Sequence, residues 1–148
     1  MDSLFSYTTC GLEGIYLRNG FDEVDTPDGV ATSIHNIEDL HRVIGLSIIC
    51  GQAILSDREI RFLRKEMDLS QKHLARILGI TEPSIRRWES GRGKISGPAD
   101  KMLRVLYQDS VEKGEVREML EHLSDLNIDA HKERMELEGT GNGWQAAA

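Results

Sequence analysis

The stretch Leu69–Arg92, LSQKHLARILGITEPSIRRWESGR, decides the fold that we expect for this chain. Ser70 is a residue type that caps helix N-termini, and apolar residues follow it at helical spacing. Gly79 stands where a chain leaving a helix commonly needs a positive φ. Thr81 is suited to cap a second helix, whose first turn tolerates Pro83. The stretch therefore predicts two short helices joined by a tight glycine turn.

The second of these helices has one apolar and one basic side. At 100° per residue, Ile85 and Trp88 share the side that faces a core, and Arg86 and Arg87 lie on the outward side. An arginine pairs bidentately with O6 and N7 of guanine, and a helix of this width fits the major groove. Two adjacent arginines also occur on ordinary solvated helices, so the pair indicates DNA binding only because of its setting.

The pattern LSQ-x-x-LA-x-x-LGI-x-x-x-x-I-x-x-WE-x-G resembles the Cro/cI-type, or xenobiotic-response-element, helix-turn-helix family, and the resemblance runs from about Ile60 to Tyr107. It implies a lambda-repressor-like helical bundle that binds double-stranded DNA. In that family the start of the first motif helix touches phosphate and the outer face of the second reads bases. The resemblance transfers these roles to Gln71, Glu82, Pro83, Ser84, Arg86 and Arg87.

Two residues depart from the family pattern. Asp68 replaces the glycine that often precedes the motif, and aspartate can still adopt the left-handed conformation. Pro83 has no N–H, so apolar shape replaces one usual polar base contact. After the motif, Arg92 and Lys94 are well placed to contact phosphates at the end of the recognition helix.

Composition bounds the remaining possibilities. The chain has 148 residues, of which 29% are charged and 39% hydrophobic, as in ordinary soluble globular proteins. No apolar run approaches a membrane span and no signal peptide opens the chain, so we expect a cytoplasmic protein without a membrane partner. Cys10 and Cys50 lack metal-ligand spacing, and His35 and His41 have no companions, so no metal, cofactor or catalytic group is predicted.

The net charge of −7 is unevenly distributed. Residues 56–107 contain 12 Lys and Arg against 7 Asp and Glu, whereas the rest of the chain contains 6 against 18. The motif region is therefore basic within an acidic protein, which lets one face meet phosphate while the flanks keep the chain soluble.

Four segments follow from the patterns. Residues 1–51 predict a small antiparallel sheet of two or three short strands, packed on a helix that Asn36 caps and Gly51 ends. Residues 52–112 form the DNA-binding domain, which starts at a Ser56–Glu59 capping box and closes with a helix from about Pro98 to Asp109. The polar side of its first helix carries Arg58, Arg61, Arg64 and Lys65. These side chains either contact flanking DNA or are exposed to solvent.

The C-terminal part is amphipathic and then polar. Residues 113–130 predict a helix from Glu115 to about Asn127, whose apolar stripe either packs within the monomer or forms a homodimer seam; we favour the seam. The stripe contains Val116, Met119, Leu120, Leu123 and Leu126. Residues 131–148 are expected to be mostly flexible, with a strand added to the N-terminal sheet as the alternative. The expected fold class is mainly α, and α+β overall.

Three function classes follow. The first is a sequence-specific transcriptional regulator. The second is an antitoxin-like module that blocks a toxin-like protein partner and regulates its own gene. A small N-terminal unit before this motif resembles MqsA-type antitoxins. Those proteins hold zinc through paired C-x-x-C motifs in that unit, whereas this chain has the single Cys10 there, so zinc binding is not carried over. The third, an enzyme, is not expected, since no nucleophile with a base, phosphate loop or metal cluster is found.

Overall fold

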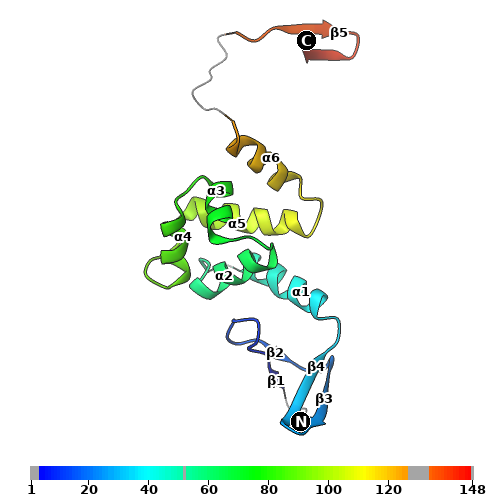
Figure 1. The fold of residues 1–148 in the computed structure, drawn as a ribbon. Coiled ribbons are helices and arrows are strands. Elements are labelled where there is room, and N and C mark those ends of the chain that lie inside the picture. Colours follow the sequence, from blue (N-terminus) through cyan, green and yellow to red (C-terminus); the bar gives the residue numbers. More distant parts are fainter. Residues whose placement is uncertain (1–3, 52, 127–133, 148) are drawn as a thin grey trace.

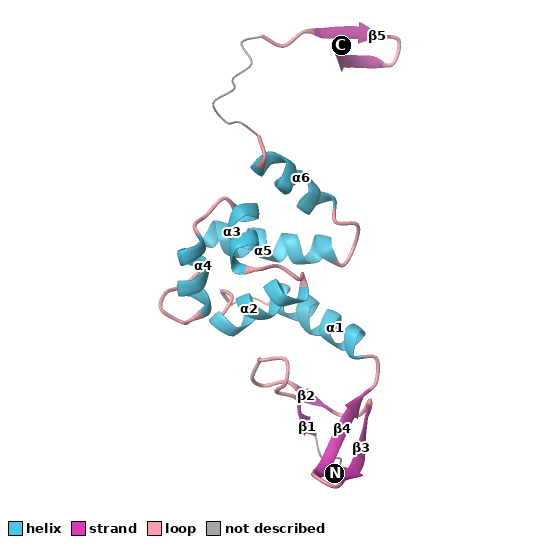
Figure 2. Cartoon of the chain, viewed as in Figure 1, coloured by secondary structure: helices cyan, strands magenta, loops and turns pink. Residues whose placement is uncertain are grey.

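The computed structural model describes residues 4–51, 53–126 and 134–147 (Figure 1). The expected end of the amphipathic helix near Asn127 and the start of the tail at His131 lie outside these residues. The described elements are helices flanked by short strands (Figure 2), in the order β1 (Phe5–Ser6), β2 (Tyr16–Leu17), β3 (Phe21–Thr26), β4 (Gly29–Ile34), α1 (Ile37–Ile49), α2 (Asp57–Glu66), α3 (Gln71–Leu78), α4 (Glu82–Glu89), α5 (Gly97–Ser110), α6 (Glu115–Ser124), β5 (Leu137–Thr140) and β6 (Gly143–Ala146). Helices and small antiparallel pairs make this an α+β fold.

The N-terminal strands form two separate antiparallel pairs. β1 pairs with β2, with Phe5 opposite Leu17, and β3 pairs with β4, with Phe21 opposite Ile34. The prediction of one sheet with two or three strands was therefore wrong. Because β1 and β2 are only two residues long, they offer β3 almost no ladder to join. The two pairs instead meet through the rings of Phe5 and Phe21, whose centroids lie 5.1 Å apart.

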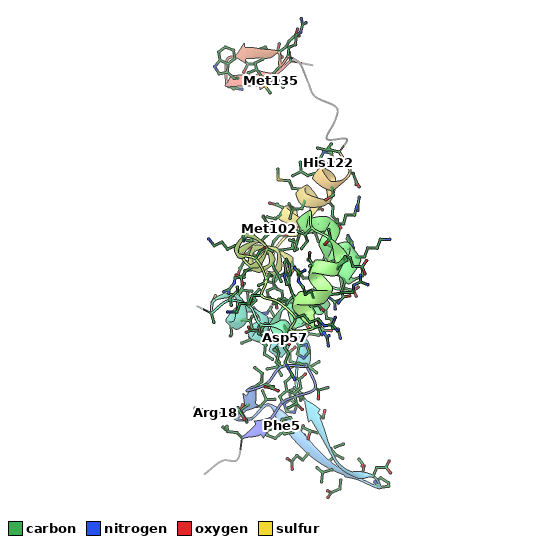
Figure 3. All side chains as sticks on the ribbon, turned by 90° about the vertical axis from the view of Figure 1, so that its left-hand side faces the viewer. Phe5, Arg18, Asp57, Met102, His122 and Met135 are labelled. Carbon is green, nitrogen blue, oxygen red and sulfur yellow. The ribbon has the colours of Figure 1, made fainter. Side chains whose placement is uncertain are left out.

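The β1–β2 unit packs on α1, as the sequence predicted. Tyr7 and Leu12 are buried, and the Tyr7 hydroxyl lies 2.6 Å from Nε2 of His41 on α1. Burial raises the pKa of Tyr7 above its ordinary value, and the nearby Cys10 and Glu66 add to that rise. The β3–β4 hairpin, in contrast, is largely exposed and projects away from the helices (Figure 3). Only the β1–β2 unit thus contributes strongly to the core.

Two of the predicted helix caps have the expected bonds. Ser56 Oγ accepts the N–H of Glu59 at 3.2 Å, and the Ser56 N–H donates to Glu59 Oε1 at 2.9 Å, so α2 begins with the predicted capping box. Ser70 Oγ accepts the N–H of His73 at 3.0 Å at the start of α3. Caps of this kind each stabilise a helix by about 1 kcal/mol, which explains why short-range sequence signals located these two helix starts.

The other two caps differ from the prediction. Asn36 and Thr81 occupy the N-cap positions of α1 and α4, but neither side chain accepts a helix N–H. Asn36 has a left-handed backbone with a φ of 48°, outside the extended region that normally directs a capping side chain toward the first turn. Thr81 Oγ1 instead lies 2.8 Å from the hydroxyl of Ser84.

One buried cluster connects the N-terminal unit with the helices. Its largest fully buried side chains come from α2, α3, α4 and α5, namely Ile60, Leu63, Leu74, Ile85, Leu103 and Leu106. Trp88 is 6% exposed, which confirms its predicted burial. Each fully buried aliphatic side chain contributes roughly 1.5–3 kcal/mol through the hydrophobic effect. No helix within residues 4–51, 53–126 and 134–147 combines the length and apolarity that a membrane crossing needs.

Arg104 on α5 fixes the connection between α1 and α2. Its guanidinium donates to the carbonyl oxygens of Ile49 at 3.0 Å, Gly51 at 2.7 Å and Ala53 at 2.6 Å. Its Nε also donates to Asp100 Oδ1 at 2.7 Å. Because the guanidinium presents several donors in one plane, a single arginine satisfies three backbone carbonyls at once. The linker is therefore held on α5.

α6 packs against α3 and α5. The buried carboxylate of Asp109 on α5 accepts the N–H groups of Val116 at 3.0 Å and Arg117 at 3.1 Å, and so caps α6. On the α3 side, the His73 ring lies 2.7 Å from a Glu121 carboxylate oxygen. Leu120 of the apolar stripe packs against the buried cluster, so the stripe is partly used within the monomer.

The C-terminal residues form a hairpin of their own. β5 pairs with β6, with Gly139 opposite Trp144, and all eight residues of the two strands are exposed. Neither strand joins the N-terminal pairs. The alternative of a strand added to the N-terminal sheet was therefore wrong. The Asn142-Gly143 turn with its positive φ at Gly143 suits a tight hairpin.

Candidate nucleic-acid interface

α3 and α4 form the predicted pair of helices around a glycine turn. Gly79 ends α3 with a φ of 70°, and the Ile80 N–H donates to the Ala75 carbonyl at 2.9 Å. Ala75 is buried where the two helices approach each other. Asp68, before α3, has a φ of 55° and takes the left-handed conformation that the sequence predicted. These backbone positions fix the angle at which α4 leaves α3.

The outer face of α4 is exposed and basic. Pro83, Arg86 and Arg87 are exposed, whereas Glu82 and Ser84 are half-buried. Glu82 Oε1 lies 4.0 Å from Arg86 Nη1, one helical turn along the same face. The sequence prediction for the two sides of α4 is therefore confirmed.

The chain that leaves α4 brings a third arginine to this face. It turns at Gly91, which has a φ of 76°, and the Arg92 N–H donates to the Arg87 carbonyl at 3.0 Å. A hollow of about 500 Å³ results, lined by Pro83, Arg86, Arg87, Ser90 and Arg92. The Arg87 side chain runs along Gly93, where any Cβ would lie only 3.3 Å from Arg87 Nε.

Four of the eight predicted site residues do not line this hollow: Glu82 and Ser84, which lie on α4 beside it, and Lys94 and Gln71, which lie on other segments. Lys94 lines a neighbouring hollow of about 600 Å³ that Arg92 and the start of α2 also border. Gln71 lies at the start of α3, where its Nε2 donates to Glu89 Oε1 at 3.2 Å. The Gln71 amide therefore has a partner within the protein, the Glu89 carboxylate.

A buried carboxylate connects the three helices of this region. Glu89, at the end of α4, has a side chain only 1% exposed. It accepts two bonds from Arg64 on α2, from Nε at 2.7 Å and Nη2 at 2.8 Å, besides the bond from Gln71. Arg64 also donates to the Leu69 carbonyl at 2.9 Å. The pair thus fixes α2 against α3 and α4.

Sequence reasoning missed this pair. It placed Arg64 on the polar side of α2, facing flanking DNA or solvent, but the side chain is only 11% exposed because Glu89 draws it inward. A signal for Glu89 was available, since Ile85, Trp88 and Glu89 follow the i, i+3, i+4 spacing of one helix face. No short-range signal connects Arg64 to it.

Comparison with known families adds one result. Residues 60–99, from within α2 to the start of α5, match the family model described as helix-turn-helix. These residues are a helix-turn-helix of the Cro/cI type. That family is one of DNA-binding, non-enzymatic domains. The match covers less than half of the chain, and neither the curated proteins nor the solved structures gave a match.

The helix-turn-helix contains the exposed cations of the region. Three of the six residues that the resemblance singled out, Pro83, Arg86 and Arg87, line one hollow on α4, and Arg92 joins them from the following loop. Among the described residues, no three histidine, cysteine, aspartate or glutamate side chains come together as a metal site. Cys10 is half-buried and Cys50 exposed, and both are free thiols. The exposed cations on this face are suited to contact with a polyanion.

Proposed function

We propose that the protein is a sequence-specific transcriptional regulator with a lambda-repressor-like bundle that places α4 in the major groove of double-stranded DNA. The observation that supports this most is the exposed basic hollow formed by Arg86, Arg87 and Arg92 on the outer face of a helix-turn-helix. A duplex is the polyanion whose groove accepts one helix, and arginine is the side chain best suited to guanine edges.

The base-reading roles fall to the outer face of α4. Arg86 and Arg87 each offer a fork of donors for O6 and N7 of guanine. Pro83 offers an apolar surface that fits a thymine methyl group. Glu82 lies 4.0 Å from Arg86 and helps to orient it, and Ser84, half-buried beside Thr81, contacts the groove edge through its hydroxyl.

The phosphate contacts flank this face. Arg92 and Lys94 lie on the exposed loop after α4, where they meet the backbone on one side of the groove. On the other side, the backbone N–H groups of Gln71 and Lys72, at the start of α3, bind a phosphate oxygen with the help of the helix dipole. These contacts set the orientation of α4 without reading sequence.

A two-fold dimer completes the proposal, because one recognition helix covers only half of a useful site. Such proteins reach specificity with two helices about 34 Å apart on DNA. α6 and the residues just after it supply the surface for the seam: Met119 is 65% exposed, Leu123 48% and, beyond the helix end, Leu126 50%. Leu120 packs against the core of its own monomer. One side of α6 thus contacts the monomer core, and the other side is left to contact a second copy.

Selection of bound fragments from the source genome, followed by footprinting, tests the function. On the selected site, Arg87→Ala should lose about 1–3 kcal/mol of binding free energy and relax the preference at one base pair. Arg92→Ala should weaken all sequences alike and flatten the salt slope by about one unit. Lys101→Ala, an exposed change on α5, is the matched control and should change neither quantity. Selection without any enriched fragment would refute the proposal, and equal losses for Arg87→Ala on cognate and random DNA would refute its base-reading role.

A further inference from the structure

A cleft separates the N-terminal unit from the helix-turn-helix. It lies between the loop Thr9–Gly11 and α2, and encloses about 540 Å³. Figure 1 shows this loop beneath α2, and Figure 3 labels Asp57 where the two parts meet. Its volume is within the range of small-molecule sites. A ligand in this cleft would touch both parts of the protein at once.

Three cations line the α2 wall of the cleft. Arg58, Arg61 and Lys65 follow one another at i, i+3 and i+7, so they lie on one face of the helix. Their bonds to the protein are weak. Arg58 reaches Glu13 and the Gly11 carbonyl only at 3.4 Å. Arg61 lies 3.6 Å from Glu89. Within the described ranges, the Lys65 ammonium makes neither a hydrogen bond nor a salt bridge.

The three carboxylates of the cleft, in contrast, already have close partners. Glu66 Oε1 lies 2.8 Å from Nδ1 of His41. Glu89 accepts two bonds from Arg64. Asp57 Oδ1 accepts the backbone N–H of Arg58 at 2.9 Å. The donors that are left for an entering molecule therefore come from the cations, which favours an anion.

The floor of the cleft is aromatic and rigid. The Phe62 ring is buried, and its centroid lies 5.6 Å from that of His41. His41 is held between the Tyr7 hydroxyl, at 2.6 Å, and Glu66, at 2.8 Å. This chain of bonds fixes the floor, so a ligand meets a preformed surface and little ordering entropy is lost on binding.

We propose that this cleft binds a small molecule with a phosphate monoester group, and that its occupancy weakens DNA binding. Three cations with donors suit the two charges and three terminal oxygens of such a group. Arg61 borders both the cleft and Glu89, which holds α4 in place. The regulatory half of this inference rests on the proposed function, whereas the site itself does not.

The site is tested by titrating the full chain with inorganic phosphate, at constant ionic strength and above pH 7, and following backbone amide signals by NMR. We expect saturable shifts confined to Gly11, Arg61, Lys65 and their neighbours, with a dissociation constant on the order of 1 mM for this minimal probe. Lys65→Gln should weaken binding about tenfold, and Lys101→Gln should leave it unchanged. Identical titration curves for Lys65→Gln and the unmodified chain, or shifts that grow linearly over the whole surface, would overturn the site.

DNA binding distinguishes a small ligand from backbone phosphates in the same cleft. Without phosphate, Lys65→Gln should keep the DNA affinity and salt slope of the unmodified chain, and phosphate should weaken DNA binding of the unmodified chain but not of Lys65→Gln. A salt slope flatter by about one unit in Lys65→Gln would assign the cleft to the DNA backbone and overturn the small-molecule site. Saturable phosphate binding by a chain that binds no DNA would support the site and overturn the regulatory half together with the proposed function.

Discussion

Replacing Glu89 by glutamine should destabilise the protein severely, although the change is nearly isosteric. The carboxylate is 1% exposed and accepts two bonds from Arg64, at 2.7 and 2.8 Å. In Glu89→Gln one oxygen becomes an NH₂ group that faces the donors of Arg64, so a buried cation loses its counter-charge. Removing one partner of a buried pair costs about 3–5 kcal/mol. For about 150 residues, 1 kcal/mol corresponds to roughly 2–4 °C, so Tm should fall by roughly 6–20 °C.

Thermal unfolding by circular dichroism and urea titration measure this loss. Glu118→Gln, an exposed carboxylate on α6, is the matched control and should stay within about 0.5 kcal/mol of the unmodified chain. The double change Arg64→Met with Glu89→Leu should recover part of the loss, because it removes both buried charges together. A Tm for Glu89→Gln equal to that of Glu118→Gln would show that the pair does not hold the three helices, and the reasoning about Glu89 would fail.

Three other predictions follow from the packing. Leu123→Asp should give a folded monomer with strongly reduced DNA affinity if α6 forms the seam, and light scattering that shows a dimer for this variant would refute the seam. Gly45→Ala should lower the free energy of unfolding by about 1–3 kcal/mol in urea titration, because the added Cβ collides with the Tyr107 phenol. At a helix position with free space the same change raises stability by about 1 kcal/mol. A measured gain of that kind would contradict the close packing of α1 on α5. Burial raises the pKa of Tyr7 and of Tyr107, where Glu66 adds to the rise and Arg42 opposes it. The folded state therefore holds the two phenol protons more tightly than the unfolded state does. The contribution of the two tyrosines to stability is complete below about pH 10 and is lost as pH rises above it. Equal slopes of unfolding free energy against alkaline pH for the unmodified chain and for Tyr7→Phe would argue against this.

Short-range physics located most of the candidate site. The left-handed positions at Asp68 and Gly79, the cap at Ser70 and the apolar side of α4 each depend on residues within about one helical turn. These features fix two helices and the turn between them, and so place Arg86 and Arg87 outward. The family pattern adds their expected role, because its fixed spacing spans the same local elements.

Long-range contacts decided the rest. The sequence placed Arg64 on a polar face, yet Glu89, 25 residues away, removes it from solvent. The Arg104 guanidinium donates hydrogen bonds to three backbone carbonyls that lie 51 to 55 residues earlier in the chain. Periodicity identifies which side of an element is apolar, but not which charged side chain finds a partner on another element. That choice depends on the free energy of desolvating two charges at a contact that exists only once the helices have packed.

The sequence by itself thus determined the helix-turn-helix, its basic outer face and the helix that follows it, because each is encoded in spacing and caps that act locally. Only the tertiary structure decided that the N-terminal strands form two pairs, that the last residues pair with each other, and that α6 divides its apolar residues between its own core and solvent. Which strands pair and which helices dock depends on segments far apart in the sequence. The arrangement that forms is the one that buries the most apolar surface and leaves the fewest backbone groups without hydrogen bonds over the whole chain.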